Sequence, residues 1–366
     1  MKELIDDIIH KGSLSPDKIC QLLSATGSEQ KELHRAANNV AVTYRGNIVY
    51  YRGLIEFSNI CIKNCYYCGI RKENKDVVRY DVDEAEILAA ARYALKNRFG
   101  SVVLQSGERT DTAFVEKINR LITKIKEESN GRLGITLSLG EQTEATYQRW
   151  FNSGAHRYLL RIETSDARLY QSLHPDDELH RFSNRLDALN NLKKIGYQTG
   201  TGVMIGLPGQ TLANLADDLL YIKNTDVDMV GMGPYIEHDN TPLTAQKKHL
   251  WPLEVRFNTA LNMVAVLRLM MPDINIAAAT ALQAIDPMGR EKALKAGANI
   301  IMPNITPTEN RKHYLLYDNK PCTDESADDC LSCLNMRISL VGKETGWDEW
   351  GDSPHYFKRC EKSPPH

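Results

Sequence analysis

The chain has 366 residues with a formal net charge of -2, and 42% of the residues are hydrophobic and 25% are charged, a composition typical of globular proteins. The near-neutral charge gives no electrostatic reason to expect nucleic acid or an anionic membrane as a partner. No apolar run is long enough to span a bilayer, and the amphipathic start MKELIDDIIHKG lacks the apolar core of a signal peptide, so we expect a cytoplasmic protein.

Helices are expected near the N-terminus. The segments KELIDDIIHK (2–11) and SPDKICQLLSAT (15–26) carry apolar residues at spacings of three and four, which places them on one face of a helix. Ser15 followed by Pro16 is typical of a helix start. We therefore assign residues 1–50 to an N-terminal helical segment.

From residue 51 onward, short apolar runs alternate with helical stretches. The runs, each with a polar or glycine-rich tip, are RGLIEFSN (52–59), GSVVLQSGE (100–108), LGITLSLGE (133–141), HRYLLRIET (156–164), TGTGVMIGLPG (199–209), DMVGMGPYI (228–236), INIAAAT (274–280) and ANIIMPN (298–304). The clearest helices between them are residues 83–98, 111–129, 181–196 and 212–224.

Eight strand–helix repeats predict an α/β fold, a parallel (β/α)8 TIM barrel over residues 51–304. Two Rossmann-like halves are the structural alternative, but no G-x-G-x-x-G motif opens a helix after the first strand. Residues 305–366 are polar, without a clear period, and contain several Trp, Pro and Gly residues. We interpret them as a C-terminal extension wrapped on the barrel and not as an independent domain.

Side-chain parity along the strands indicates a polar barrel interior, because alternate residues of a strand share one face. The polar residues of the predicted inner face are Arg157, Arg161, Glu163, Thr136 and Ser138. The alternative, in which they face the covering helices, would bury charged groups without partners at a high cost. We therefore expect an open or ligand-filled interior.

Six of the eight cysteines form two groups of three: Cys61, Cys65 and Cys68, and Cys322, Cys330 and Cys333. In a reducing compartment, clustered cysteines are more often metal ligands or redox groups than disulfides. Zinc usually takes four ligands from two pairs, whereas three thiolates on one loop suit a [4Fe–4S] cluster with one open iron. The first group follows the first strand, at the barrel end where an active site is expected. A zinc site or a purely structural site is the alternative.

The first group, C-x3-C-x-aromatic-C with Tyr67 as the aromatic residue, resembles the signature of the radical S-adenosylmethionine (SAM) superfamily. The resemblance implies that the three cysteines bind a [4Fe–4S] cluster, that its open iron binds SAM, and that one electron from the reduced cluster cleaves SAM to a 5′-deoxyadenosyl radical. QSGE (105–108) and GVMIGLPGQ (202–210) resemble the segments that hold the amino and adenine ends of SAM. The residues that the resemblance assigns to SAM are Tyr67, Gly107, Glu108, Glu163 and Arg185.

Over most of its length the chain resembles the HydE family of [FeFe]-hydrogenase maturases. The segments that carry this likeness are IEFSNICIKNCYYCGIR, VLQSGE, TLSLGE, RYLLRIET, VGMGPYI…TPL, ANIIMPN and the second cysteine group. The family implies radical chemistry on a small, sulfur-bearing, cysteine-derived substrate during assembly of the hydrogenase cofactor. It also implies an anaerobic setting, reduced ferredoxin or flavodoxin as electron donor, and other maturases as partners.

The residues that would line the substrate cavity are Arg161, Thr136, Ser138, Met232 and Thr280. Arg161 would clamp a substrate carboxylate, because a guanidinium group pairs with a carboxylate through two hydrogen bonds. A salt bridge from Arg161 to Glu163 or Glu56 is an alternative role compatible with the first. For Arg185, the alternative is a solvated charge on its helix.

The second group, Cys322, Cys330 and Cys333, matches the spacing at which some HydE proteins carry an auxiliary cluster. The resemblance therefore implies an additional [2Fe–2S] or [4Fe–4S] cluster. A zinc site or free thiols are the alternatives.

Three places depart from the family pattern. Ile162 stands for a histidine and Ala279 for the first of two threonines, and Glu237 and Asp239-Asn240 stand for prolines after the sixth strand. Because they fall near the expected pocket, the alternative function is a HydE-like paralogue or a methylornithine-synthase-like enzyme acting on another amino-acid-derived substrate.

Two other functions are disfavoured by the sequence. Biotin synthase requires cysteines on inner strands, and strands two to eight contain none. A non-enzymatic iron–sulfur carrier would not require the glycine-rich strand tips and the charged barrel interior.

Overall fold

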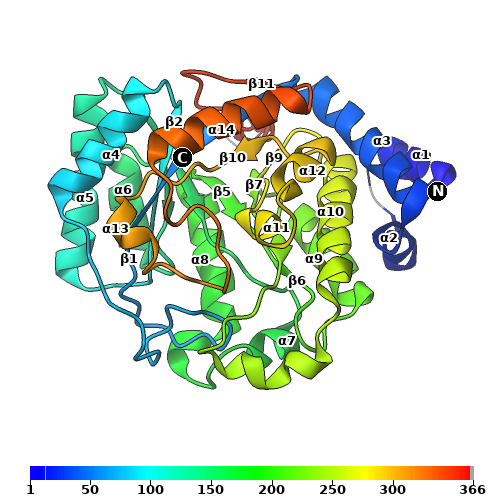
Figure 1. Ribbon diagram of the computed structural model, residues 1–366, viewed down its shortest axis with the longest axis horizontal. Helices are drawn as coiled ribbons and strands as arrows, with labels where there is room; N and C mark the ends of the chain where they lie inside the picture. Colours follow the sequence, from blue (N-terminus) through cyan, green and yellow to red (C-terminus); the bar gives the residue numbers. More distant parts are fainter. Residues whose placement is uncertain (13, 363–366) are drawn as a thin grey trace.

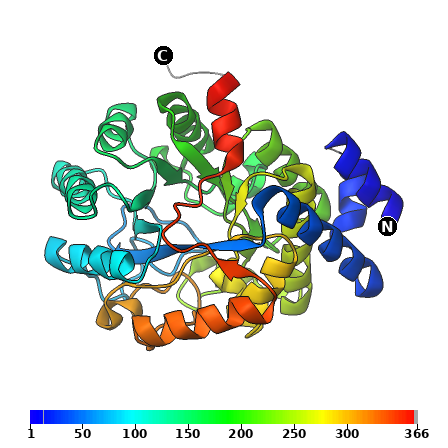
Figure 2. The same ribbon diagram turned by 90° about the horizontal axis from the view of Figure 1, so that it is seen from above.

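Three helices precede the barrel and lie on one side of it, where the chain begins in Figures 1 and 2. They are α1 (Lys2–Lys11), α2 (Pro16–Leu23) and α3 (Gly27–Arg45). Pro16 stands in the first turn of α2, as the Ser-Pro pair predicted. The computed structural model, which describes residues 1–12 and 14–362, places α2 and α3 against α10 (Leu253–Met270).

The eight predicted strand segments form a curled parallel sheet. The strands are β1 (Ile48–Ser58), β2 (Ser101–Ser106), β3 (Gly134–Ser138), β4 (Arg157–Leu159), β5 (Gln198–Thr201), β6 (Met204–Ile205), β7 (Met229–Val230), β8 (Gly233–Pro234), β9 (Asn275–Ile276) and β10 (Ile300–Ile301). Neighbouring strands follow the order β10-β1-β2-β3-β4-β5-β7-β9. A parallel bridge between Ala277 and Ile300 joins the two ends of this order. The predicted (β/α)8 barrel is therefore confirmed.

The fifth and sixth predicted strands each break into two short pieces. β5 pairs with β7, and β6 pairs separately with β8. A Cβ atom on Gly202, between β5 and β6, would lie 1.9 Å from the carbonyl oxygen of Gly231, between β7 and β8. The two backbones approach more closely than any side chain would allow, which explains the glycines inside these predicted strands.

Helices cover the outside of the barrel (Figure 1). Besides α10 they are α4 (Glu84–Lys96), α5 (Thr112–Glu128), α6 (Glu144–Asn152), α7 (Ala167–Ser172), the 3₁₀ helix η1 (Glu178–His180), α8 (Phe182–Ile195), α9 (Leu212–Asn224), the 3₁₀ helix η2 (Pro242–His249), α11 (Thr280–Ile285) and α12 (Gly289–Lys295). Asp83, Asp111 and Thr211 cap α4, α5 and α9 by accepting a backbone N–H, as residues of these types commonly do. Almost every residue of α10 is buried, because this helix lies between the barrel and α3.

The chain beyond β10 contains α13 (Thr308–Arg311), α14 (Ala327–Leu340), β11 (Glu344–Thr345) and α15 (Pro354–Lys362). β11 pairs with the start of β1, and in Figure 2 α14 and α15 lie on opposite sides of that strand. The sequence of this region, which is polar and without a clear period, did not predict these two helices. The domain boundaries drawn from the sequence remain predictions.

The predicted strand parity is confirmed. Leu137 and Tyr158 are fully buried in the main hydrophobic core, whereas their neighbours Thr136 and Leu159 line a cavity inside the barrel. One face of these strands therefore packs on the helices and the other faces inward.

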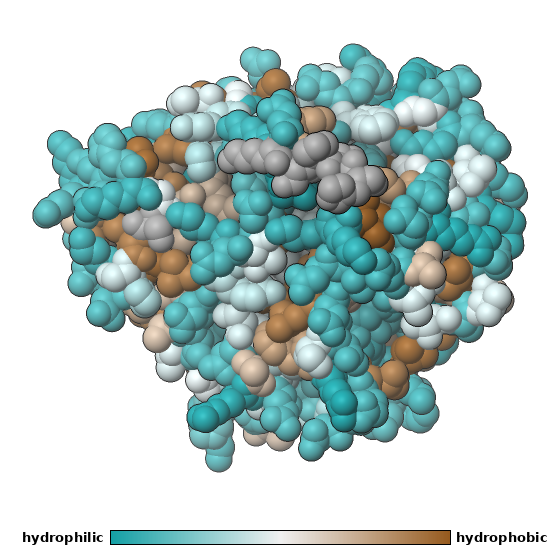
Figure 3. All heavy atoms as spheres, turned by 180° about the vertical axis from the view of Figure 1, so that it is seen from behind, coloured by the Kyte–Doolittle hydropathy of each residue, from teal (hydrophilic) through white to brown (hydrophobic). Residues whose placement is uncertain are grey.

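Polar side chains cover most of the molecular face shown in Figure 3, where apolar side chains form small separate groups. Exposed large apolar residues lie on several elements, among them Ile9 on α1 and Met336 on α14. Within residues 1–12 and 14–362, no helix has the length and apolar character needed to cross a bilayer.

Candidate active site

The loop that carries the first three cysteines follows β1 and is tied to several neighbouring segments. The Ile62 N–H donates to the carbonyl of Glu108 after β2, at 2.9 Å. The Tyr66 N–H donates to Leu173 at 2.9 Å, and the Tyr66 carbonyl accepts from Leu243 of η2 at 3.1 Å. Backbone contacts from three directions thus hold the loop at the carboxyl end of the strands.

The three thiols of this loop lie close enough to influence one another. Burial raises the pKa of Cys65 to about 12, with a further contribution from the charge of Cys61. Burial also raises the pKa of Cys61 and of Cys68, and the other two cysteines add to the effect at Cys68. The free thiols are therefore protonated at neutral pH, and binding of iron must release protons.

The donor set fits an iron–sulfur cluster better than a single metal ion. Within the described ranges, no three His, Cys, Asp or Glu side chains lie close enough together to hold one ion. A [4Fe–4S] cluster gives each thiolate its own iron, so its cysteines stand further apart than the ligands of one ion. Cys61, Cys65 and Cys68 are free thiols, and three thiolate ligands would leave one iron open.

A network of four buried charges lies beside the cysteine loop. Lys63 Nζ is 2.9 Å from Glu141 Oε2 and 3.3 Å from Glu108 Oε1. Arg185 Nε is 2.5 Å from Glu141 Oε1, and its Nη2 is 4.0 Å from Glu108 Oε2. Burial acts to raise the pKa of Glu141, but Arg185 and Lys63 lower it overall. Burial and the neighbouring Glu141 raise the pKa of Glu108.

The network places two predicted residues and adds two that the prediction missed. Glu108 and Arg185 lie within 4.0 Å of each other there, and Arg185 is buried rather than solvated; their role toward SAM stays a prediction. Lys63 and Glu141 were not singled out, although Glu141 ends the TLSLGE segment and Lys63 lies between two cysteines. These positions, after β3 and within the cysteine loop, were the available signal. Gly107 lets β2 approach the cysteine loop, because a Cβ atom there would lie 2.8 Å from Cys61 Cβ.

Glu163 follows β4 and has a φ angle of 64°, which is rare for residues other than glycine and is often found at functional sites. Its backbone is fixed by hydrogen bonds, from the Glu163 N–H to Gly202 at 3.0 Å and from the Met204 N–H to the Glu163 carbonyl at 2.9 Å. Arg161 Nη2 lies 2.9 Å from Glu163 Oε2, and this buried oxygen accepts no hydrogen bond in the described structure. The partner of Glu163 Oε2 is thus the charge of Arg161.

An apolar group lies next to Tyr67. Tyr67 packs against a cluster that consists of Leu173, Met204, Leu207, Tyr235 and Leu243. Gln210 Oε1 accepts from the N–H of Gly206 at 2.7 Å and of Leu207 at 3.1 Å, which fixes the glycine-containing turn after β6. The side chains of the cluster are buried, and Tyr67 is partly buried against them.

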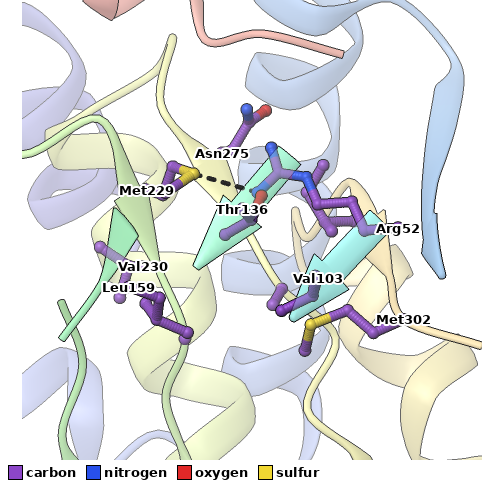
Figure 4. A pocket seen from close by; sticks show the side chains of 11 residues that line it. Arg52, Val103, Thr136, Leu159, Met229, Val230, Asn275 and Met302 are labelled. Carbon is purple, nitrogen blue, oxygen red and sulfur yellow. Dashed lines mark hydrogen bonds between the residues drawn. The ribbon is translucent and has the colours of Figure 1, made fainter. Parts of the chain in front are cut away.

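A small cavity lies inside the barrel, lined by residues of several strands (Figure 4). Its volume is about 30 Å³, enough for one or two water molecules. Arg52 Nη1 is 3.0 Å from Met229 Sδ, and Arg52 Nε and Nη2 have no hydrogen-bond partner in the described structure. The remaining lining combines Thr136 and Asn275 with apolar side chains.

The five predicted substrate residues occupy different surroundings. Thr136 lines the cavity and accepts from Arg157 Nε at 3.0 Å. Arg161 donates through Nη2 to the Val203 carbonyl at 3.0 Å, while its Nε has no partner in the described structure. Ser138 ends β3 and Thr280 begins α11, both partly buried, and Met232 lies in the main core. Their roles toward a substrate remain predictions.

The C-terminal extension contributes side chains to the same end of the barrel. Lys320 Nζ is 2.5 Å from Glu56 Oε1 on β1, and both side chains are buried. Tyr314 OH accepts from Gln105 on β2 at 3.3 Å. Glu56 therefore pairs with Lys320, and of the two predicted carboxylate neighbours of Arg161 only Glu163 is adjacent.

Two departures from the family pattern serve packing. Ile162 is fully buried in the main core and faces away from the barrel interior. Glu237 Oε2 accepts from Arg256 Nη1 at 2.8 Å, and the same nitrogen donates to the Tyr235 carbonyl at 2.6 Å. These residues hold the segment after β8 in place.

The second cysteine group is only partly described. Cys322 is partly buried with a φ angle of 63°, and Cys333 is exposed on α14. Cys330 also belongs to α14, but its side chain lies outside the described residues. The auxiliary cluster therefore remains a prediction.

Comparison with known proteins assigns the family. Residues 55–222 match the model of the Radical SAM superfamily. The [FeFe] hydrogenase maturase subunit HydE of Thermotoga maritima is 44% identical over 89% of this chain and 90% of its own. The chain belongs to the HydE family of radical SAM enzymes. Membership confirms the predicted superfamily and SAM-cleaving class of enzyme, and it implies a [4Fe–4S] cluster and SAM as cofactors.

Relatives outside the HydE family share the same overall structure. 3-Methylornithine synthase of Methanosarcina acetivorans is 29% identical over 93% of this chain and 92% of its own. The crystal structure of methylornithine synthase (PylB) has a TM-score of 0.79 at 26% identity, covering 94% of this chain and 98% of that chain. The HydE-family fold is thus shared with enzymes of another function.

Proposed function

We propose that this HydE-family enzyme acts on a small, sulfur-bearing, cysteine-derived substrate in the assembly of the [FeFe]-hydrogenase cofactor. Bound at Cys61, Cys65 and Cys68, the cluster would pass one electron to SAM, and the carbon–sulfur bond would break to give methionine and a 5′-deoxyadenosyl radical. Reduced ferredoxin or flavodoxin would supply the electron, and other maturases would handle the product. The observation that carries the proposal is the 44% identity to HydE over 89% of the chain.

The residues around the site suit these roles. Glu163 has a carboxylate oxygen that accepts no hydrogen bond in the described structure and is ion-paired with Arg161, and a carboxylate suits the hydroxyl or amino groups of SAM. The apolar cluster beside Tyr67 suits adenine. Arg161 Nε has no acceptor in the described structure and suits a substrate carboxylate. The fixed charges of Glu108 and Arg185 orient the polar end of SAM without rearranging.

The test is electron paramagnetic resonance of the anaerobically reconstituted, reduced protein with and without SAM, followed by an assay for 5′-deoxyadenosine. A SAM-induced change of the cluster signal that is lost in Cys65→Ala and kept in Cys20→Ala supports the site. A cluster signal indifferent to SAM contradicts it. Product analysis with cysteine-derived iron complexes then tests the substrate.

A second candidate is a methylornithine-synthase-like reaction on another amino-acid-derived substrate. The similarity to methylornithine synthase over 94% of this chain and the departure at Ala279 favour it. Deoxyadenosine formation stimulated by free amino acids, but not by cysteine-derived iron complexes, would identify this alternative.

A further inference from the structure

Arg79 lies between the cysteine loop and α4, and its guanidinium group binds both ends of that loop. Nη1 donates to the carbonyl of Asn59 at 2.6 Å and of Ile70 at 2.7 Å. Nη2 donates to the carbonyl of Arg71 at 2.6 Å. Asn59 precedes the first cysteine and Ile70 follows the third. One side chain therefore closes the loop.

The positive charge of Arg79 is not neutralised by a carboxylate. In the described part of the chain, its hydrogen-bond acceptors are all backbone carbonyls. The electrostatic influence of Cys61 and Cys68 reaches its guanidinium group and opposes the lowering of the Arg79 pKa by burial. Other nearby cations, Lys63, Arg185 and Arg71, each lie within 4 Å of a glutamate oxygen. Among the described residues, Arg79 is thus a cation near two of the thiols that has no carboxylate partner.

Backbone groups around the loop point in the directions that the positive charge of Arg79 favours. Ile70 presents its carbonyl to Arg79. The Glu108 N–H donates to Cys61 Sγ at 3.3 Å. Hydrogen bonds to the sulfurs and the net charge around a cluster both set its reduction potential. A cation and an N–H group directed at a sulfur favour the reduced form.

We propose that Arg79 is a positioning residue that holds the cysteine loop closed and that eases one-electron reduction of the cluster through its unpaired positive charge. This inference rests on the proposed function, because it assumes a [4Fe–4S] cluster at the three cysteines. The electron comes from a low-potential one-electron donor such as reduced ferredoxin or flavodoxin and ends on the cluster. No bond of Arg79 forms or breaks.

The redox role is tested in Arg79→Gln and Arg79→Lys by measuring the cluster signal at a series of fixed potentials. Arg79→Gln should lower the ratio of reduced to oxidised cluster about tenfold at a given potential, which is ~59 mV for a one-electron couple. Arg79→Lys keeps the charge and should keep most of the potential. An unchanged potential in Arg79→Gln overturns the redox role.

Arg268 provides the matched control. It is buried and also donates to backbone carbonyls, those of Gly297, Pro272 and Ile274, but it lies at the opposite end of the barrel, before β9 and β10. Arg268→Gln should leave the potential unchanged. An equal shift in both variants would mean a general loss of structure and overturn the proposal.

The positioning role is tested without a cluster. In the cluster-free protein, alkylation of Cys61 and Cys68 should be several-fold faster in both Arg79 variants than in the wild type, because a lysine cannot bridge the same carbonyls. Cys20 on α2 serves as the internal reference. Equal alkylation rates overturn the closed loop. If the wild type takes up no SAM-responsive cluster, the proposed function and the redox role fail, while the alkylation result still decides the positioning role.

Discussion

Removal of Arg185 should destabilise the cluster-free protein strongly. Arg185 is buried, 2.5 Å from Glu141 through Nε, and donates through Nη1 to the Arg161 carbonyl at 2.8 Å. Arg185→Met would leave Glu108 and Glu141 with Lys63 as their remaining cation. Breaking a buried ion pair by removing one partner typically costs about 3–5 kcal/mol, so we expect a loss of that size in the free energy of unfolding.

The assay is anaerobic urea unfolding followed by circular dichroism, with Arg149→Met as the matched control. Arg149 makes two short contacts with Glu116, but both side chains are about 40% exposed, and exposed pairs contribute about 0–1 kcal/mol. Adding Glu141→Gln to Arg185→Met should recover part of the loss, because one uncompensated charge disappears. If Arg185→Met costs no more than the Arg149 control, the four buried charges are not a coupled network.

Three further predictions concern the site and the barrel ends. Gly140→Ala should abolish the SAM-induced signal change, because the new Cβ atom would lie 2.2 Å from Glu108 Oε2. Gly131 is the control, since it has the same φ of 74° and a Cβ atom there would meet no atom within 4 Å. Gly131→Ala should only lower the free energy of unfolding by ~1–2 kcal/mol. Burial raises the pKa of Asp218 to about 6, so the folded protein retains a proton that the unfolded chain releases between about pH 4 and 6. Stability should therefore fall as pH rises through this window, and Asp218→Asn should remove up to ~3 kcal/mol of that change in unfolding midpoints measured across it. Asp273 and Asp226 raise the pKa of His355 despite its burial, so the docking of α15 should weaken as pH rises through that raised pKa. Proteolysis of α15 should then become faster with rising pH. In His355→Gln the rate of proteolysis should not depend on pH over this range.

Local patterns predicted the barrel well because the information lies within each segment. The alternation in RYLLRIE placed Tyr158 in the core and Leu159 toward the cavity, as found. The period of three and four in KELIDDIIHK gave the bounds of α1. The cysteine spacing, in turn, identified the loop at which the charged residues converge.

Features that depend on distant partners were not visible in the sequence. Lys63 and Glu141 are separated by 78 positions, and each alone resembles a surface charge. The same holds for Lys320 and Glu56, which are 264 positions apart. The sequence of α14 shows no clear helical period of apolar residues, because the apolar face of this helix is narrow.

The departures from the HydE pattern do not all bear on the substrate. Ile162 faces the helices rather than the cavity, so it adds packing where a polar ring would need a partner. Glu237 forms an ion pair with the buried Arg256. A proline at position 237 would leave this arginine without that partner, which explains the acidic residue. Ala279 differs from both, because it stands at the start of α11 with its Cβ atom 2.9 Å from the position a Cβ would take on Gly233 of β8. For the second candidate function, the change of substrate is therefore to be sought where α11 meets β8.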